Sequence, residues 1–585
     1  MYRSQIRPLK SLPLRSRPLT SHALAWSCDG ELAVATDDTV YIFLPEYPSP
    51  GTDRDAAVKD VTQSQFSLSL NATGIFLPLS QVNTQLCAFA GIRLPPPGTE
   101  DADESVNRSS VDGCQVTGAG GSISQVVRVE WSPNGLGANR RPVLMLMTTN
   151  GELLALGEYT DPQSTVASGL RARNTKMWKI LWGLGAGMPI PAEDHEGAYR
   201  TMDERIKSFS WAKEISPGRA LLAYMTDEDD VVIMSVQYFT QPGSTAQTSN
   251  DFVWQIREVA RFDAAGPHRP VDVMDPDYVP NGTPFSLKWS PWVPSGDSRI
   301  ASLAFISSNY VGFRRIAIQG GWEKVQEPTV AVEDSDTTGI CLSLSTDAFV
   351  EWEDARLVPR EEALEDPDEG SESDETDDEF QEEIASSIKI HPYRFRFWGM
   401  ASSPGDGSTV CLISKYSTQL PSRRGFSRLL FGSCPIEQQN AADSQAVLAN
   451  DSLTTEGQMW EWMYGGGGQV PGATIPETTI TTDPESPLQA FFNSVKAQQK
   501  CAFCDQELQN DGTEARCPEN HTFAACSSSG LAILAPGVSR VCAVCQRRCL
   551  KDAELRKLAA EYIGPDQTIP PSGELCGGCG GKFVA

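Results

Sequence analysis

The residues best suited to chemistry lie in a cysteine-rich tail. Nine of the fifteen cysteines of this 585-residue chain fall within its last 85 residues, together with one histidine. The candidate ligands are Cys501, Cys504, Cys517, His521, Cys526, Cys542, Cys545, Cys549, Cys576 and Cys579. Six of them form three Cys-x-x-Cys pairs, in which one tight turn can aim both sulfurs at a single tetrahedral ion. Because no export signal is evident, this pattern predicts zinc sites rather than disulfides.

Counting ligands predicts two zinc ions, because two tetrahedral sites need eight of the ten candidates. A sequential scheme assigns Cys501, Cys504, Cys517 and His521 to one ion, and Cys542, Cys545, Cys576 and Cys579 to the other. A cross-braced scheme, as in RING-type modules, exchanges the middle pairs, and Cys526 or Cys549 can replace a nominal ligand. Since protein fills all four positions of each ion, we expect structural sites. Metal binding should then supply much of the folding free energy of so small a module.

The charge of the tail indicates what the module binds. From Cys501 to Ala585 it carries eight Lys or Arg and ten Asp or Glu, a net charge of −2. A finger that reads DNA normally presents a basic face. The tail is therefore predicted to dock onto protein.

The part of the chain that precedes this tail shows a repeated pattern of short predicted strands. It is clearest at His22–Glu46, where apolar and polar residues alternate and Asp29-Gly30 and Asp37-Asp38 mark turns. The same order of strand, tryptophan with a small neighbour, Pro/Gly turn and strand recurs at Trp26, Trp131, Trp211, Trp289 and Trp398. This repetition predicts an all-β, WD40-like β-propeller of six or seven blades. A β-sandwich, or two unrelated all-β domains, is the alternative.

The spacing of the copies and the composition between them suggest the domain plan. Copies lie farther apart than the ~40–45 residues of one blade, so we expect degenerate blades, long insertions or both. The predicted segments are a basic arm at 1–19, a propeller at 20–434, a polar linker with a short apolar segment at 435–500, and a zinc-binding domain at 501–585. The arm is basic and rich in proline, and we expect it to end in a strand that closes the propeller.

An acidic insertion interrupts the predicted propeller at residues 361–383. It carries fourteen acids and no Lys or Arg, so it repels itself and is expected to be disordered. It is either a solvated insertion or an acidic arm for a basic partner, with Ser371, Ser373 and Thr376 as predicted phosphorylation sites because acids follow them.

The formal net charge of −28 argues against broad nucleic-acid binding by this chain alone. No run approaches the ~20 apolar residues of a membrane span. Because the apolar region of a secretory signal is not evident either, we expect cytosol or nucleus.

Both ends of the chain resemble a known family. The opening ALAWSCDGELAVATDDTVYIFLPE and the tail motifs CPENH, CAVCQRR and CGGCGGKFV resemble the delta, or ninety-kilodalton, subunit of transcription factor IIIC in a fungal-like form. The resemblance implies a nuclear, non-catalytic scaffold in the complex that recognises internal promoters of tRNA and similar genes. It implies as partners the other subunits, the TATA-binding-protein-containing initiation factor and RNA polymerase III, with DNA contacted mainly through these partners and no membrane involved.

The resemblance also carries a histone acetyltransferase activity, for which the residues offer no support. The chain lacks the Arg/Gln-x-x-Gly-x-Gly/Ala loop that holds acetyl-CoA in common acetyltransferases, and no nucleophile–base pair stands out. We therefore expect no catalytic residues and no cofactor besides zinc. Two alternatives stay open: a propeller-plus-zinc scaffold of another assembly, such as a ubiquitin ligase or a signalling coat complex, and an acetyltransferase with an unfamiliar site.

Overall fold

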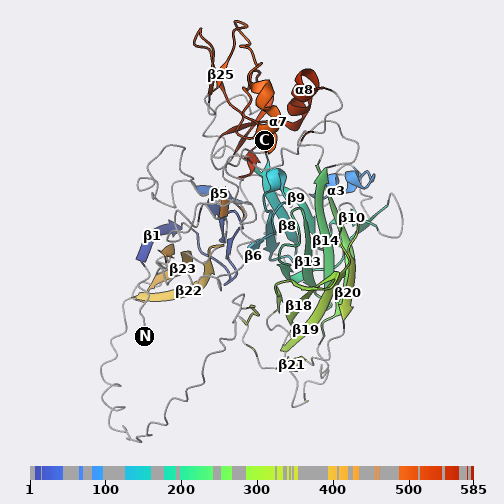
Figure 1. Cartoon of the computed structure of the whole chain (residues 1–585). Coiled ribbons are helices and arrows are strands. Elements are labelled where there is room, and N and C mark those ends of the chain that lie inside the picture. Colours follow the sequence, from blue (N-terminus) through green and yellow to red (C-terminus); the bar gives the residue numbers. More distant parts are fainter. Residues whose placement is uncertain are drawn as a thin grey trace, which may run out of the picture.

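The computed structural model builds the chain up to Ser433 mainly from antiparallel sheets (Figure 1). It describes residues 7–14, 16–37, 39–43, 65–69, 82–95, 125–159, 177–192, 198–240, 252–265, 274, 285–307, 309–322, 326–333, 339–341, 344, 348–352, 393–404, 408–418, 426–433, 454, 456–457, 460, 487–510, 514–542, 547–564, 569, 576 and 581–584. The acidic insertion at 361–383, with Ser371, Ser373 and Thr376, lies outside these residues.

Four of the sheets are formed by strands that follow one another in the chain. The first contains β2 (Leu24–Trp26), β3 (Leu32–Ala35), β4 (Thr39–Phe43) and β5 (Gln65–Ser69). The second contains β6 (Val126–Trp131), β7 (Leu144–Thr148), β8 (Leu153–Tyr159) and β9 (Met177–Leu184). The third contains β12 (Ile206–Trp211), β13 (Arg219–Thr226), β14 (Asp230–Thr240) and β15 (Phe252–Asp263).

The fourth sheet has additional short strands. Its main path is β16 (Phe285–Trp289), β18 (Ser298–Ser307), β19 (Tyr310–Gln319) and β20 (Thr329–Glu333). Two short strands pair with β18 and β19 respectively: β17 (Val293–Ser295) and β21 (Ile340–Cys341). Outside the large sheets lie α3 (Thr84–Phe89), the 3-10 turn η1 (Ala138–Arg140) and the hairpin of β10 (Pro189–Pro191) with β11 (Tyr199–Thr201).

The fifth sheet joins the two ends of the propeller region. It contains β22 (Tyr393–Ser402), β23 (Ser408–Ser417) and β24 (Phe426–Ser433). Its outer strand is β1 (Arg7–Leu14), which pairs antiparallel with β24. The strand expected at the end of the basic arm is thus present, and it closes this sheet.

The repeated tryptophans lie at corresponding places, each on an edge strand of its sheet (β2, β6, β12, β16 or β22). In three of these tryptophans the indole Nε1 donates to a backbone carbonyl on the tryptophan-bearing strand of a neighbouring sheet. These pairs are Trp26 with Ala401 (3.3 Å), Trp131 with Ala25 (3.1 Å) and Trp289 with Ser210 (3.2 Å). Trp398 instead donates to Ser414 Oγ (2.7 Å), and Trp211 is anchored by its backbone amide on Glu130 Oε1 (3.0 Å). Four of the five tryptophans are therefore hydrogen-bonded to a neighbouring sheet.

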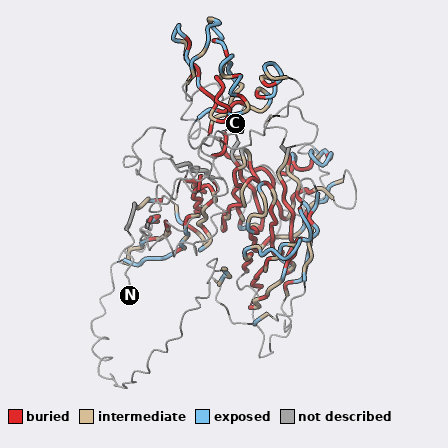
Figure 2. The backbone as a smooth tube through the Cα atoms, in the orientation of Figure 1, coloured by how far each residue is buried: buried red, intermediate tan, exposed pale blue. Residues whose placement is uncertain are grey.

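Three apolar clusters connect the sheets in series, and Figure 2 shows the buried residues concentrated there. The first joins the β22–β24 sheet to the β2–β5 and β6–β9 sheets, the second joins β6–β9 to β12–β15, and the third joins β12–β15 to β16–β20. Each strand alternates inward and outward residues, so both faces of an inner sheet can pack against a neighbour.

One face of the β22–β24 sheet is uncovered. Phe395, Phe397, Met400 and Phe426 are 59%, 61%, 63% and 63% exposed. The described residues contain five sheets of four or more strands, against the six or seven blades predicted. The blade count of the whole chain stays a prediction.

The tail forms a separate small body at one end of the sheets (Figure 1). Its elements are α7 (Pro487–Lys496), β25 (Gln509–Asn510), β26 (Glu514–Arg516), β27 (Thr522–Ala524), β28 (Ser539–Cys542), β29 (Arg548–Leu550), α8 (Asp552–Tyr562) and β30 (Phe583–Val584). Helix α7 contributes Leu488, Phe492 and Val495 to the tail's core, upstream of the boundary predicted at residue 501. Within the described part of the chain, no helix is long and apolar enough to span a bilayer.

Candidate metal centre

Four predicted ligands converge in the first half of the tail. The ligand atoms of Cys501, Cys504, Cys517 and His521 all lie within 4.8 Å of one another. Cys504 Sγ is 3.6 Å from Cys517 Sγ, and His521 Nδ1 is 3.5 Å from Cys501 Sγ and 3.4 Å from Cys517 Sγ. A tetrahedron with Zn–S bonds of about 2.3 Å has S–S edges of about 3.8 Å. The donor set and its spacing therefore fit zinc, and this Cys3His cluster suggests a zinc site.

The local backbone explains why these four side chains meet. Cys501 N donates to Gln506 O (2.8 Å), which closes the turn that carries Cys501 and Cys504. A second turn is closed by Cys517 N donating to His521 O (3.2 Å), and strands β26 and β27 extend from it. Asp505 and Asn520 adopt positive φ angles of 56° and 65° in these turns. Asn and Asp tolerate this conformation better than other non-glycine residues.

Backbone amides also point at the sulfurs. Phe503 N donates to Cys501 Sγ (3.4 Å) and His521 N to Cys517 Sγ (3.3 Å). Burial raises the pKa of Cys501, but the amides of Phe503 and Cys504 and the neighbouring thiols outweigh it and lower the pKa to about 7. Since zinc binds the thiolate, this environment prepares Cys501 as a ligand.

The other predicted ligands cluster in the second half of the tail. Cys526, Cys542, Cys549 and Cys576 are all buried in one core cluster, whereas Cys545 and Cys579 lie outside the described residues. Cys542 N donates to Arg547 O (3.0 Å) and Cys576 N to Gly581 O (2.8 Å). Both bonds repeat the one from Cys501 N to Gln506 O, so in each segment the first cysteine donates to the carbonyl five residues further on.

Strand pairing brings the last two turns together. Cys542, at the end of β28, pairs with Phe583 in β30, which follows the Cys576 turn. Cys526 and Cys549 lie nearby: Ser527 Oγ is 2.8 Å from Cys549 Sγ and 3.6 Å from Cys576 Sγ. The hydrogen bond with Cys549, followed by burial, raises the pKa of the Cys526 thiol. The described residues thus show one complete Cys3His set and, apart from it, four buried cysteines in one core cluster.

Sequence reasoning missed a buried polar centre where the tail meets the propeller. It contains Asp29, Asn134, Arg141, Glu456 and Lys582, far apart in the chain. No regular spacing connects these residues. The one signal that could have drawn attention was Lys582, a single cation next to a cysteine turn.

Comparison with known proteins yields two family models that match the chain. The β-propeller domain of transcription factor IIIC subunit delta matches residues 26–371. A second model, described as a proposed zinc-finger of the transcription factor IIIC complex, matches residues 484–583. A search among curated proteins found no match.

Similar solved structures include two propeller domains. The WD40 domain of SCAP from fission yeast is 9% identical, with 71% of this chain and 84% of that chain covered and a TM-score of 0.21. The Nup133 β-propeller domain of Vanderwaltozyma polyspora is also 9% identical, with 73% and 99% covered and a TM-score of 0.19. Together with the family models, the sheets described above identify a mostly-β, WD40-like propeller followed by a cysteine-rich tail.

Proposed function

Because this chain belongs to the delta-subunit family of transcription factor IIIC, we propose that it is a non-catalytic scaffold within that complex. Membership makes it a subunit and a partner of the other subunits. Its proposed role is to link the promoter-bound subunits to recruitment of the TATA-binding-protein-containing initiation factor and RNA polymerase III, in the nucleus. The observation that carries the proposal is the presence of both family matches on one chain, at residues 26–371 and 484–583.

The charge of the chain supports contact with DNA through partners. The net charge is −28, and the tail from Cys501 to Ala585 has eight basic and ten acidic residues. Affinity for DNA depends on Lys and Arg that neutralise phosphates. A chain with this balance is suited to bind protein surfaces while other subunits hold the promoter.

The proposed cofactor is zinc at two structural sites. Cys501, Cys504, Cys517 and His521 would hold one ion, and their geometry supports the sequential scheme for it. Cys542, Cys545, Cys576 and Cys579 would hold the other, supported by the shared turn closure at Cys542 and Cys576. When bound, zinc would cross-link the turns and supply folding free energy, with protein ligands at every position.

The scaffold proposal is tested by purifying the tagged full-length chain from cells and identifying its partners by mass spectrometry. We expect the other transcription factor IIIC subunits in near-stoichiometric amounts. We also expect the isolated chain to bind a tRNA gene no more tightly than unrelated DNA of equal length. Recovery of ubiquitin-conjugating enzymes or coat-complex subunits instead, or strong gene-specific binding by the isolated chain, would contradict the proposal.

The zinc proposal is tested by metal analysis of the full chain. Wild type should contain two zinc ions, and Cys504→Ser and Cys576→Ser should each lose one, because oxygen is a poor substitute for thiolate sulfur at zinc. The matched control is Cys411→Ser, in strand β23 and remote from the tail's ligands. A wild-type content of one or none would refute the two-site assignment.

A further inference from the structure

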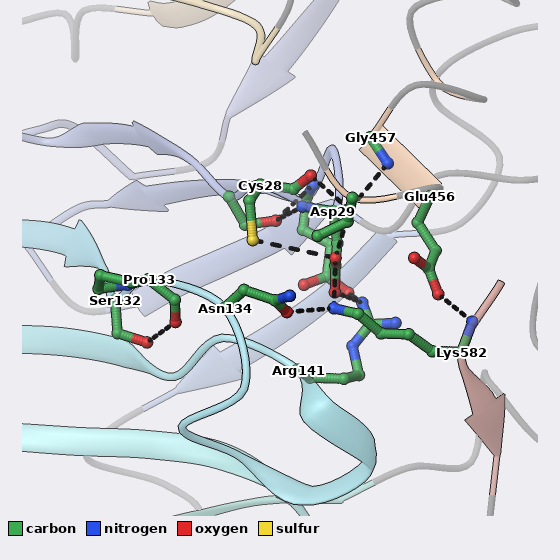
Figure 3. Close-up of polar contacts among 12 residues, drawn as sticks. Cys28, Asp29, Ser132, Pro133, Asn134, Arg141, Glu456, Gly457 and Lys582 are labelled. Atoms are coloured by element: carbon green, nitrogen blue, oxygen red, sulfur yellow. Dashed lines mark hydrogen bonds and ion pairs between the residues drawn. The ribbon is translucent and has the colours of Figure 1, made fainter. Parts of the chain in front are cut away.

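The side chain of Lys582 leaves the tail and enters the propeller. Its Nζ donates to Asp29 Oδ1 (2.8 Å) and to Asn134 Oδ1 (2.7 Å), and its side chain is 4% exposed (Figure 3). Asp29 lies in the turn between β2 and β3, and Asn134 follows β6. Two neighbouring sheets therefore contribute one oxygen each to the same ammonium group.

The surrounding charges explain why a cation is stable in this buried position. A buried ammonium is costly unless it is paired and hydrogen-bonded. Arg141 also lies within 3.6 Å of Asp29 and pairs with Glu31, so two cations and two carboxylates alternate. Burial alone would lower the pKa of Lys582, but the carboxylates of Asp29 and Glu456 outweigh it and raise the pKa.

The main chain next to the ammonium is also held. Lys582 N donates to Glu456 Oε1 (2.9 Å). The backbone and the side chain of one lysine are thus recognised separately, by Glu456 and by the pair of Asp29 and Asn134 (Figure 3). This two-point recognition specifies an extended segment with a lysine at one position.

A third segment covers the site. Thr454 Oγ1 lies 2.7 Å from Cys28 O and 2.8 Å from Asp29 Oδ1, and Gly457 N donates to it (3.1 Å). The ring of Trp460 packs against Trp26 with centroids 4.7 Å apart. A Cβ added at Gly30 (φ +79°) would lie only 2.8 Å from Trp460 Cβ. The glycine turn therefore allows the close approach that seals the site from water.

We propose that Asp29 and Asn134 of the propeller, with Glu456 of the segment that follows it, form a lysine-binding site, and that this chain fills the site with its own Lys582. The ligand class is a primary alkylammonium on an extended peptide. Its function is to lock the cysteine-rich tail onto the propeller in one orientation. Lys582 directly follows Gly581, whose carbonyl accepts a hydrogen bond from Cys576 N, so the lysine is attached next to a predicted zinc ligand.

The first test is a double-mutant cycle on the full-length chain, using Lys582→Met, Asp29→Asn and both together. Hydrogen exchange is measured on peptides that contain Gly457 and residues 581–584, with β13–β14 as the internal reference. Removing one partner of a buried pair should speed exchange by about 100-fold or more. The double variant should return to within about tenfold of wild type, since the pair is removed as a whole and Arg141 keeps Glu31 as its partner.

The control is Lys557→Met, an exposed lysine of α8 whose pair with Glu554 contributes little. The proposal is overturned if Lys582→Met exchanges like this control, or if the effects of the two single changes simply add. Should Lys582→Met disturb the tail as a whole, recovery in the double variant still decides whether the charge pair is responsible.

The second test asks whether the site recognises an ammonium as such. Lys582→Ala in the full-length chain removes the side chain beyond Cβ, and n-propylammonium is added as the probe. We expect it to restore protection at Gly457, while 1-propanol, of similar size but uncharged, does not. Equal rescue by both compounds, or by neither, would overturn the assignment of a lysine-binding site.

Discussion

At the scale of single residues, a half-buried histidine influences how the stability of the structure responds to pH. His22 lies just before β2, and its carbonyl accepts a hydrogen bond from Val129 N (3.2 Å). Its ring meets Phe349 edge-on, with centroids 5.7 Å apart. Burial, with smaller contributions from Arg128 and Lys288, lowers the pKa of His22 to about 4. This imidazole is therefore neutral in the folded chain at physiological pH.

His22 should make the propeller less stable in weak acid. Its pKa is about 6.5 when unfolded and about 4 when folded, so the unfolded chain binds the proton first. The stabilising contribution is complete above pH 6.5 and is lost as the pH falls towards 4. Urea unfolding of wild type and His22→Gln at pH 7.5 and 5, at saturating zinc, measures this. We expect the loss between the two pH values to be smaller in the variant. Equal losses would show that His22 is not buried as described.

At the scale of elements, the tryptophans on the edge strands hold neighbouring sheets together. Trp131 is 6% exposed, donates to Ala25 O and packs edge-on against Trp178 at 6.0 Å. Its contacts therefore belong to two sheets, so its loss should weaken the interface rather than one strand.

Replacing Trp131 by alanine should cost about 3–5 kcal/mol of unfolding free energy, the usual range for emptying a buried aromatic site. Chemical denaturation followed by circular dichroism measures the change. Phe397→Ala is the matched control, because Phe397 also lies on a tryptophan-bearing edge strand but is 61% exposed. We expect the control to change stability by about 0.5 kcal/mol or less. Similar losses in both variants would argue against the repeat as the source of stability.

The features of the fold and of the metal site that the sequence predicted are those encoded by residues close together in the chain. Each copy of the tryptophan pattern, the Asp-Gly turn at residues 29–30 and the set of Cys501, Cys504, Cys517 and His521 lies within one short stretch of the chain. The structure confirms the corresponding strands, turn and cluster. The contact of Lys582 with Asp29 could not be predicted from the sequence. The two residues are separated by almost the whole chain, and no sequence pattern links two single charged residues at such a distance.

At the scale of the whole molecule, the tail and the propeller have separate cores linked by a polar contact. The tail's apolar clusters involve residues from Leu488 onwards, whereas the propeller's clusters contain none of them. The two bodies should therefore lose structure under different conditions, even though Lys582 connects them.

Removal of zinc by a chelator should unfold the tail first, because thiolate–metal bonds supply much of the stability of such small cores. We expect hydrogen exchange to rise in residues 514–524, while the amides of β13 and β14 stay protected. Re-addition of zinc is the control and should restore the tail. Simultaneous loss of protection in both regions would show that the two bodies unfold as one.

The pairing of β1 with β24 has a consequence for the chain as it leaves the ribosome. At about 5–20 residues per second, synthesis of the segment between the two strands takes on the order of tens of seconds. During that time β1 has no β24 to pair with, and its free backbone groups could pair with strands of other chains. Pro8 and Pro13 donate no backbone hydrogen bond and Lys10 carries charge, and both features discourage wrong pairing. The composition of this outer strand therefore suits a nascent chain in which the pairing partner of β1 is the last strand of that sheet to be made.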